Sequence, residues 1–162
     1  MIAALVALAL STAGLNLSSQ NLKGDSRAFP ADVVEHRAVV VLTFSKSAAD
    51  QASEWTRRLR ENEQSLAAGI YQIAILENVP VFFRSFVISS LRRAIPKNLH
   101  DHFWIATSGA KEWQERVGSK SLDEAHLFVL EGRSEITWRF HGMFSEARLQ
   151  SLLAACSVPR NQ

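Results

Sequence analysis

The sequence predicts a single α/β domain built on a mixed β-sheet with helices on both faces, and three features predict it. Residues 38–44 (AVVVLTF) are continuously apolar and β-branched, as in a strand that is buried on both faces. Strand-like and helix-like segments then alternate, which implies right-handed parallel crossovers. Two apolar runs flank the turn Glu131-Gly132-Arg133-Ser134, which predicts an antiparallel hairpin at the edge of the same sheet.

The composition indicates a folded protein and argues against several classes of partner. The chain has 162 residues, of which 47% are hydrophobic and 21% are charged, enough for one domain with a short appendage. Its net charge is only +2 and it has no long basic run, so we expect no nucleic-acid partner. The single Cys156 excludes an intrachain disulfide, a CxxC motif and a cysteine-rich metal site. We expect no cofactor and no small-molecule substrate.

The N-terminal sequence differs in kind from the rest. Residues 1–10 (MIAALVALAL) are apolar over the length of a signal-peptide core, which is too short to span a bilayer. Small residues precede a potential cleavage after Ala13, although no Lys or Arg occurs before Lys23. We interpret residues 1–20 as a signal peptide or an apolar N-terminal anchor, with a miscalled start codon as the other alternative. The domain then covers 21–158 and a tail covers 159–162, in an exported bacterial protein that is periplasmic or membrane-associated.

The first half of the domain has clear helix and strand signals. After the strand at 38–44, Ser47 offers an N-cap, and Asp50 follows three residues later as in a capping box. Apolar residues then recur at helical spacing up to Leu66, and Gly69 is expected to end this helix. Residues 70–76 (IYQIAIL) predict a second buried strand.

The second half begins with a helix that starts at Asn78 and Pro80 and ends before Pro96. Its expected apolar side consists of Val79, Phe82, Phe83, Phe86, Val87, Leu91, Ala94 and Ile95. A strand at 102–107 and a short helix follow, the helix capped by Ser108 and closed by Gly118. The hairpin strands are expected at 125–130 and 135–140. The last helix starts at Ser145 and carries an apolar stripe of Leu149, Leu152, Leu153 and Cys156.

This order of elements resembles the thioredoxin superfamily, in particular the branch of periplasmic thiol oxidoreductases and peroxiredoxins, most clearly over residues 105–142. A more particular likeness rests on short motifs: Asn21-Leu22-x-Gly24 with Pro30, Phe44-Ser45-Lys46, Gln51 with Trp55, Glu77-Asn78, Leu91-Arg92, Ile95-Pro96, and Ile136-x-Trp138-Arg139 with Gly142, Glu146 and Leu149. In these the chain resembles the family of mitochondrial ATP synthase assembly factors. The resemblance implies a chaperone for a membrane-embedded subunit. The apolar start favours a bacterial relative.

The residues on which thioredoxin chemistry depends are missing. That chemistry needs a thiolate at the start of the first long helix and a second cysteine one turn later. Here Ser47 and Asp50 stand at those positions, and Ala125 stands where the superfamily has a cis-proline. We therefore expect a vestigial, redox-inactive site formed by Ser47, Asp50, Ala125 and His126. Cys156 is expected to be a buried core residue of the last helix.

Two other chemistries receive little support from the sequence. Ser47, Asp50 and His126 should lie at one end of the sheet, but an N-cap explains the first two, and no G-x-S-x-G motif is present. His100 and His102 are two imidazoles close together, and the other histidines are scattered, so we expect no metal site.

The helix after Pro80 carries more apolar surface than one sheet-facing side needs. Val81 and Ile88 lie off its expected main face, beside arginines. One interpretation is a partner contact formed by Phe82, Arg84, Ile88, Arg92 and Arg93, and the other is a helix buried on a wide face with the arginines at its rim.

Two functions follow from these observations. The first is a redox-inactive thioredoxin-like protein that binds a protein client and acts as an assembly factor, for example for a membrane-embedded complex such as ATP synthase. The alternative is an atypical thiol oxidoreductase or peroxiredoxin-like enzyme of the cell envelope, which would work through Cys156 or through a partner's thiol.

Overall fold

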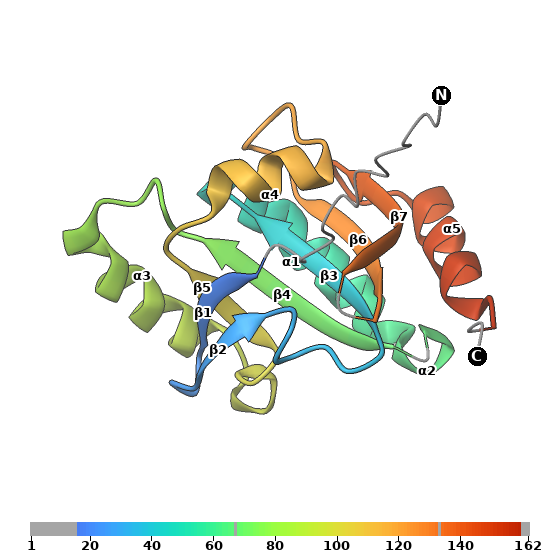
Figure 1. Ribbon diagram of the computed structural model, residues 1–162, viewed down its shortest axis with the longest axis horizontal. Coiled ribbons are helices and arrows are strands. Elements are labelled where there is room, and N and C mark those ends of the chain that lie inside the picture. Colours follow the sequence, from blue (N-terminus) through green and yellow to red (C-terminus); the bar gives the residue numbers. More distant parts are fainter. Residues whose placement is uncertain (1–15, 67, 133, 160–162) are drawn as a thin grey trace, which may run out of the picture.

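The computed structural model describes residues 16–159 except for residues 67 and 133, and it shows one seven-stranded sheet with the order β2-β1-β5-β4-β3-β6-β7 (Figure 1). The strands are β1 (Leu17–Asn21), β2 (Ser26–Phe29), β3 (Arg37–Thr43), β4 (Gly69–Ile75), β5 (Phe103–Ala106), β6 (His126–Glu131) and β7 (Glu135–His141). The helices are α1 (Lys46–Glu61), α2 (Glu63–Leu66), α3 (Val81–Ala94), α4 (Ala110–Val117) and α5 (Glu146–Ser157), with a 3₁₀ turn at Lys97–Leu99. None of the helices in this part of the chain is long and apolar enough to cross a membrane.

The centre of the sheet confirms the predicted mixed topology. Strand β3 pairs in parallel with β4, and β4 pairs in parallel with β5. On its other side β3 pairs antiparallel with β6, which forms the predicted hairpin with β7. Every residue of β3 is buried, as its continuous apolar sequence predicts.

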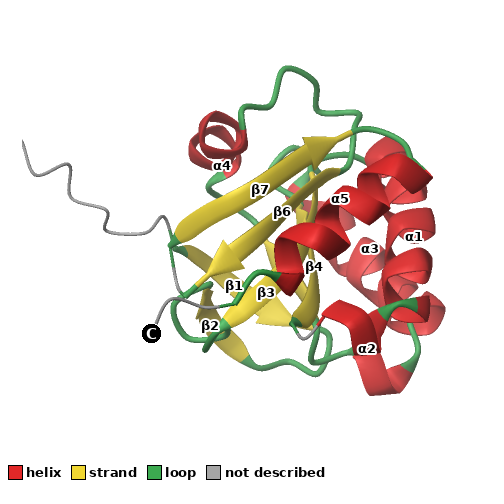
Figure 2. Ribbon diagram, turned by 90° about the vertical axis from the view of Figure 1, so that its right-hand side faces the viewer, coloured by secondary structure: helices red, strands yellow, loops and turns green. Residues whose placement is uncertain are grey.

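Helices cover both faces of this sheet (Figure 2). On one face Trp55 of α1 and Leu152 of α5 pack against sheet residues such as Val39. On the opposite face Trp113 of α4 packs against Phe128, with their ring centroids 5.7 Å apart. Helix α3 lies on the same side as α1 and α5, over β4 and β5 (Figure 2).

The first two strands are a structural finding that the sequence did not predict. β1 pairs antiparallel with β5 and with β2, so it extends the sheet beyond β5. It begins at Leu17 and so takes into the sheet four residues that the sequence analysis placed in the N-terminal segment. The rest of that segment, residues 1–15, lies outside the described residues, as do residues 160–162 of the tail.

Two predicted helix boundaries are wrong, and the structure shows why. The N-cap of α1 is Ser45, whose backbone is extended and whose side chain accepts a hydrogen bond from the Ala48 N–H at 3.2 Å. Ser47 and Asp50 therefore form no capping box. Helix α1 ends at Glu61, and Gly69 opens β4 instead of closing the helix.

The cap of α4 is also displaced from the predicted Ser108. Gly109 takes that place with a φ of 86°, in the left-handed region that favours glycine. A Cβ at this position would stand 2.4 Å from the Cδ2 atom of Leu17. The absence of a side chain at Gly109 thus lets the start of β1 approach the start of α4.

A buried arginine joins the first residue of β3 to the end of α5. The Arg37 guanidinium donates to the Glu131 carboxylate and to the backbone carbonyls of Cys156 and Val158, the last at 2.9 Å. Arg37 is 8% exposed, so these acceptors hold a charge that water scarcely reaches.

We predict that Arg37→Met lowers the free energy of unfolding by about 2 to 4 kcal/mol, because it leaves carbonyl and carboxylate acceptors unpaired in a buried setting. Urea denaturation followed by tryptophan fluorescence measures this change. Arg57→Met is the matched control, because Arg57 forms only exposed ion pairs within α1. An Arg37 variant as stable as this control would contradict the prediction.

Candidate functional site

Ser47, which the sequence analysis expects at the place of the thioredoxin nucleophile, lies in the first turn of α1. This turn lies where β3 ends, at the edge of the sheet that holds the carboxyl ends of the parallel strands. The exposed Ser47 hydroxyl donates to Asp123 Oδ1 at 2.8 Å, and its oxygen is 3.1 Å from Ser45 Oγ. Asp123 comes from the loop between α4 and β6, and the sequence analysis missed it because no local pattern marks a contact over such a separation in the chain.

His126 lies at the same end of the sheet but is held in a different network. It is 1% exposed, and its Nε2 atom is 3.0 Å from Ser119 Oγ and 3.3 Å from the Ser121 carbonyl oxygen. Its ring meets Phe44 edge-on, with centroids 5.6 Å apart. Burial lowers the pKa of His126, and this outweighs the opposite effect of the hydrogen bond with Ser121.

These contacts do not assemble a hydrolytic triad. Ser47 pairs with Asp123, whereas His126 pairs with Ser119. Asp50 is exposed on α1, one turn beyond Ser47. The fold therefore places the three predicted residues at one end of the sheet, but the hydrogen bonds give no serine–histidine relay.

Ala125, which the sequence analysis expects at the place of a cis-proline, has a hydrogen-bond partner for each of its backbone polar groups. Its N–H donates to Gln51 Oε1 at 3.0 Å, and its carbonyl accepts from the Gly142 N–H at 2.9 Å. The residue itself is fully buried. Within the described chain the cis peptide bond is found at Phe29–Pro30. At Ala125, then, the backbone N–H and C=O each already have one partner within the chain.

Cys156 is far from this end of the sheet. It lies in the last turn of α5, whose end is bound by Arg37 at the start of β3, whereas Ser47 follows the end of β3. Cys156 is 2% exposed, as the sequence predicted, and burial raises the pKa of its thiol. The thiolate that exchange chemistry requires is therefore disfavoured.

Helix α3 faces the sheet with only part of the apolar side that the sequence predicts. Its inner side consists of Val87, Ile88 and Leu91, which pack on a cluster with Ala74 and Ile105 of the sheet. Val79, Val87, Leu91 and Ile95 face this cluster as expected, whereas Ala94 is exposed. Phe82, Phe83 and Phe86, which were expected on the same side, are exposed instead, together with Val81. Their exposed fractions are 74% for Val81, 77% for Phe82, 51% for Phe83 and 65% for Phe86. We call these four residues the α3 aromatic surface.

The predicted contact residues of α3 therefore divide into two groups. Phe82 and Arg93 are exposed, whereas Ile88 faces the sheet and cannot meet a partner. Arg84 folds back and donates to the Val79 carbonyl at 3.0 Å, and Arg92 donates to the Leu22 carbonyl at 3.0 Å. These two side chains attach the helix to the domain. Sequence periodicity did not separate the exposed phenylalanines from the inner residues because apolar residues occur on nearly every side of the helix.

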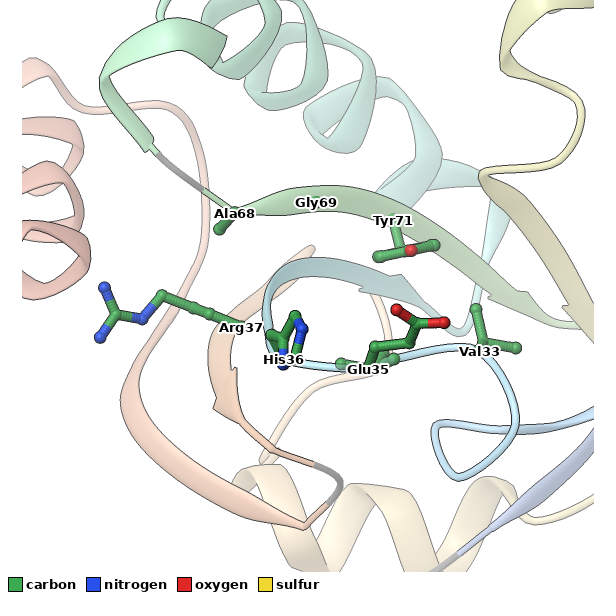
Figure 3. Close-up of a pocket in the computed structure, with 8 residues that line it drawn as sticks. Val33, Glu35, His36, Arg37, Ala68, Gly69 and Tyr71 are labelled. Carbon is green, nitrogen blue, oxygen red and sulfur yellow. The ribbon is translucent and has the colours of Figure 1, made fainter. Parts of the chain in front are cut away.

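A shallow hollow lies at the opposite end of the sheet, beside the first residues of β3 and β4 (Figure 3). Glu35 and Tyr71 lie across it from one another, and Arg37 points away from it (Figure 3). Burial raises the pKa of Tyr71, with smaller contributions from the charges of Glu35 and Asp101. The hollow contains no residue that the sequence analysis singled out for chemistry.

The two histidines considered for metal binding are explained by local contacts. His100 Nε2 is 2.8 Å from the Ile95 carbonyl oxygen, and His102 Nδ1 is 2.8 Å from Asp101 Oδ1. The His102 ring also stacks on Tyr71. In the described ranges no group of three or more His, Cys, Asp or Glu residues is arranged to hold a metal ion.

Comparison with known proteins identifies the fold. No family model matches the sequence. A search of curated proteins finds no match either. Among solved structures, a protein from Chlorobium tepidum described as a thiol:disulfide interchange protein DsbE matches with a TM-score of 0.58 and 12% identity, over 88% of this chain and 93% of that one. A thio-disulfide isomerase from Thermus thermophilus matches with a TM-score of 0.55 and 16% identity, over 91% and 96%.

A third match is BsSco, a member of the Sco family of cytochrome c oxidase assembly proteins. Its TM-score is 0.55 at 9% identity, over 90% of this chain and 94% of that one. At such identities the matches concern the fold alone. The chain has a thioredoxin-like fold, with a single cysteine and no CxxC pair.

We predict that Cys156 does not react with an aromatic disulfide reagent in native buffer and reacts fully after denaturation, because its side chain is buried and its thiolate is disfavoured. Absorbance of the released thiol follows the reaction. Ser53→Cys, in which the new thiol is exposed on α1, is the control for reagent access. Labelling of native Cys156 as fast as that of the control would contradict the buried assignment.

A second prediction concerns the effect of pH on stability. Because burial lowers the pKa of His126 below its ordinary 6.5, the unfolded chain binds this proton more readily than the folded one. The free energy of unfolding should therefore fall as pH decreases from about 6.5 towards the lowered value.

Urea denaturation at a series of pH values tests this, with His126→Gln expected to flatten the dependence. His36→Gln, at an exposed position, should leave it unchanged. Equal slopes for the two variants would show that His126 is not responsible.

Proposed function

We propose that this protein is a redox-inactive, thioredoxin-like binding protein that acts on a protein client as an assembly factor. The observation that carries the proposal is that a serine, and not a cysteine, stands at the expected thiol position. Ser47 stands there with its hydroxyl bound to Asp123, and the lone thiol, Cys156, is buried at the other end of β3.

A serine in this place cannot take over the exchange reaction. Thiol–disulfide exchange requires a sulfur nucleophile that attacks a disulfide and later leaves from it. The start of a helix can lower the pKa of a thiol enough to form a thiolate, but the pKa of a serine hydroxyl is far higher. In addition, Asp50 stands where a second thiol would be needed to resolve a mixed disulfide.

The α3 aromatic surface is the better candidate for the client contact. Large aromatic side chains with a nearby arginine are the residues that dominate binding energy at protein interfaces. Phe82 and Phe83 have ring centroids 4.5 Å apart, and both are exposed. At Ala125, in contrast, the backbone N–H and C=O already have partners within the chain.

Two further observations support an assembly role at a membrane. The sequence resembles the ATP synthase assembly factor family in its short motifs, and its apolar start favours an exported or membrane-associated protein. The fold is also that of BsSco, which belongs to a family of assembly proteins. We therefore propose that the client is a membrane-embedded protein, such as a subunit of ATP synthase.

We predict that photo-crosslinking recovers one membrane protein with the wild-type chain and that Phe82→Ser/Phe83→Ser abolishes this recovery. The photoreactive residue is placed at Ser89, on the same exposed side of α3. Both phenylalanines are exposed, so the double variant should keep its thermal midpoint. Recovery is measured by quantitative mass spectrometry of crosslinked membranes. The matched control is Ser47→Ala/Asp123→Ala, which removes the vestigial hydrogen bond.

Two results would count against these assignments. Loss of crosslinking only with the Ser47 and Asp123 changes would overturn the assignment of the contact to α3 and place it at the end of the sheet that holds Ser47. Insulin reduction above that of a Cys156→Ala control would support the alternative of an atypical thiol oxidoreductase.

A further inference from the structure

Helix α3 presents one exposed stripe in which aromatic and cationic residues are separated along the helix. Phe82, Phe86, Ser89 and Arg93 follow one another at spacings of four, three and four residues, which places them on one side. All four are exposed, whereas the opposite side of α3 packs on β4 and β5. The outer side is therefore apolar at its start and cationic at its end.

The charge of α3 is entirely positive. Its sequence, VFFRSFVISSLRRA, contains three arginines and no acidic residue, and the exposed Lys97 follows it. Arg84 and Arg92 donate to backbone carbonyls, which leaves their charge uncompensated. None of the ion pairs found in the described residues includes an arginine of α3.

This charge selects among the occupants that an apolar helix surface can accept. A second copy of the chain would bring two positively charged helices together, which is unfavourable. An anionic lipid surface matches both the apolar and the cationic part of this helix. Aromatic side chains enter the boundary below the headgroups, and arginines contact the lipid phosphates.

The topology brings the start of β1 to the same end of the sheet as the start of α3. Helix α3 starts after the carboxyl end of β4, which is parallel to β5. Strand β1 runs antiparallel to β5, with Ser19 opposite Ala106 at the carboxyl end of β5. The chain therefore enters β1 at the edge where α3 begins. The residues that precede β1 in the sequence include the apolar run 1–10.

We propose that the α3 aromatic surface binds a bilayer surface containing anionic lipid, with Phe82 and Phe86 in the interface and Arg93 at the headgroups. The inference rests on the proposed function, in which α3 is the contact surface, and it adds that the protein meets its client while lying on the membrane. One orientation directs both the start of α3 and the entry of the chain into β1 towards the bilayer.

The test places an environment-sensitive nitrobenzoxadiazole probe on the full chain at Phe86→Cys, in a Cys156→Ala background. The local probe separates binding by α3 from any binding by residues 1–15. The matched control carries the probe at Thr137→Cys, an exposed position on β7 at the far edge of the sheet. Each protein is titrated with vesicles of phosphatidylcholine alone and of phosphatidylcholine mixed with phosphatidylglycerol.

With the mixed vesicles we expect a blue shift and a several-fold rise in emission at position 86 but not at position 137. Vesicles of phosphatidylcholine alone should bind more weakly. Adding Phe82→Ser should lower the partition coefficient about tenfold, and Arg93→Glu about fivefold or more for the mixed vesicles only. High salt should weaken binding in the same way as Arg93→Glu.

A silent probe at position 86 with mixed vesicles would overturn the inference, and so would an equal response at position 137. A response that depends on protein concentration without lipid would identify a second copy as the occupant instead.

A silent probe combined with client crosslinking that is lost in Phe82→Ser/Phe83→Ser would overturn the lipid contact and leave the proposed function standing. A lipid response without any client crosslinking would support the lipid contact and contradict the proposed function.

Discussion

The burial of β3 on both of its faces is the constraint on which the rest of the domain depends. A strand with no polar side chain between Ala38 and Leu42 must be covered on each side, since each 100 Å² of its apolar surface left in water would cost about 2.5 kcal/mol. Val39 and Val41 are covered by α1 and α5, and Val40 and Leu42 by the side that includes α4. The parallel pairing with β4 requires a crossover helix, and α1 meets that need.

The same strand also fixes where chemistry could occur. Its carboxyl end sets the start of α1 and with it the position of Ser47, the residue that we expect in place of a reactive thiol. Arg37 lies at the amino end of this strand and donates hydrogen bonds to the carbonyls of Cys156 and Val158, at the end of α5. The nucleophile position and the only sulfhydryl are thus kept apart by the length of one strand, and no small adjustment of side chains can unite them.

Much of this architecture could be predicted because the central strands and the hairpin consist mainly of apolar residues. The predictions failed where buried positions are polar, as in β1, and where a helix has more apolar residues than it buries, as in α3. In β1 the buried positions Ser19 and Asn21 are satisfied by local hydrogen bonds with Arg27 and Asp25, so hydropathy does not reveal a strand there. In α3 the excess of apolar residues left several faces equally suitable for the sheet. Asp123 reaches Ser47 only through the tertiary fold.

The closed backbone at Ala125 has a consequence for how selective this protein can be. A site that reads the main chain of its ligand accepts many sequences, because every peptide offers the same amide groups. Here Gln51 and Gly142 already occupy the amide and carbonyl that such a ligand would use. For the client contact that we propose, recognition would then depend on side chains and shape, which differ from one ligand to the next. The binding protein that we propose would then serve a narrow set of partners.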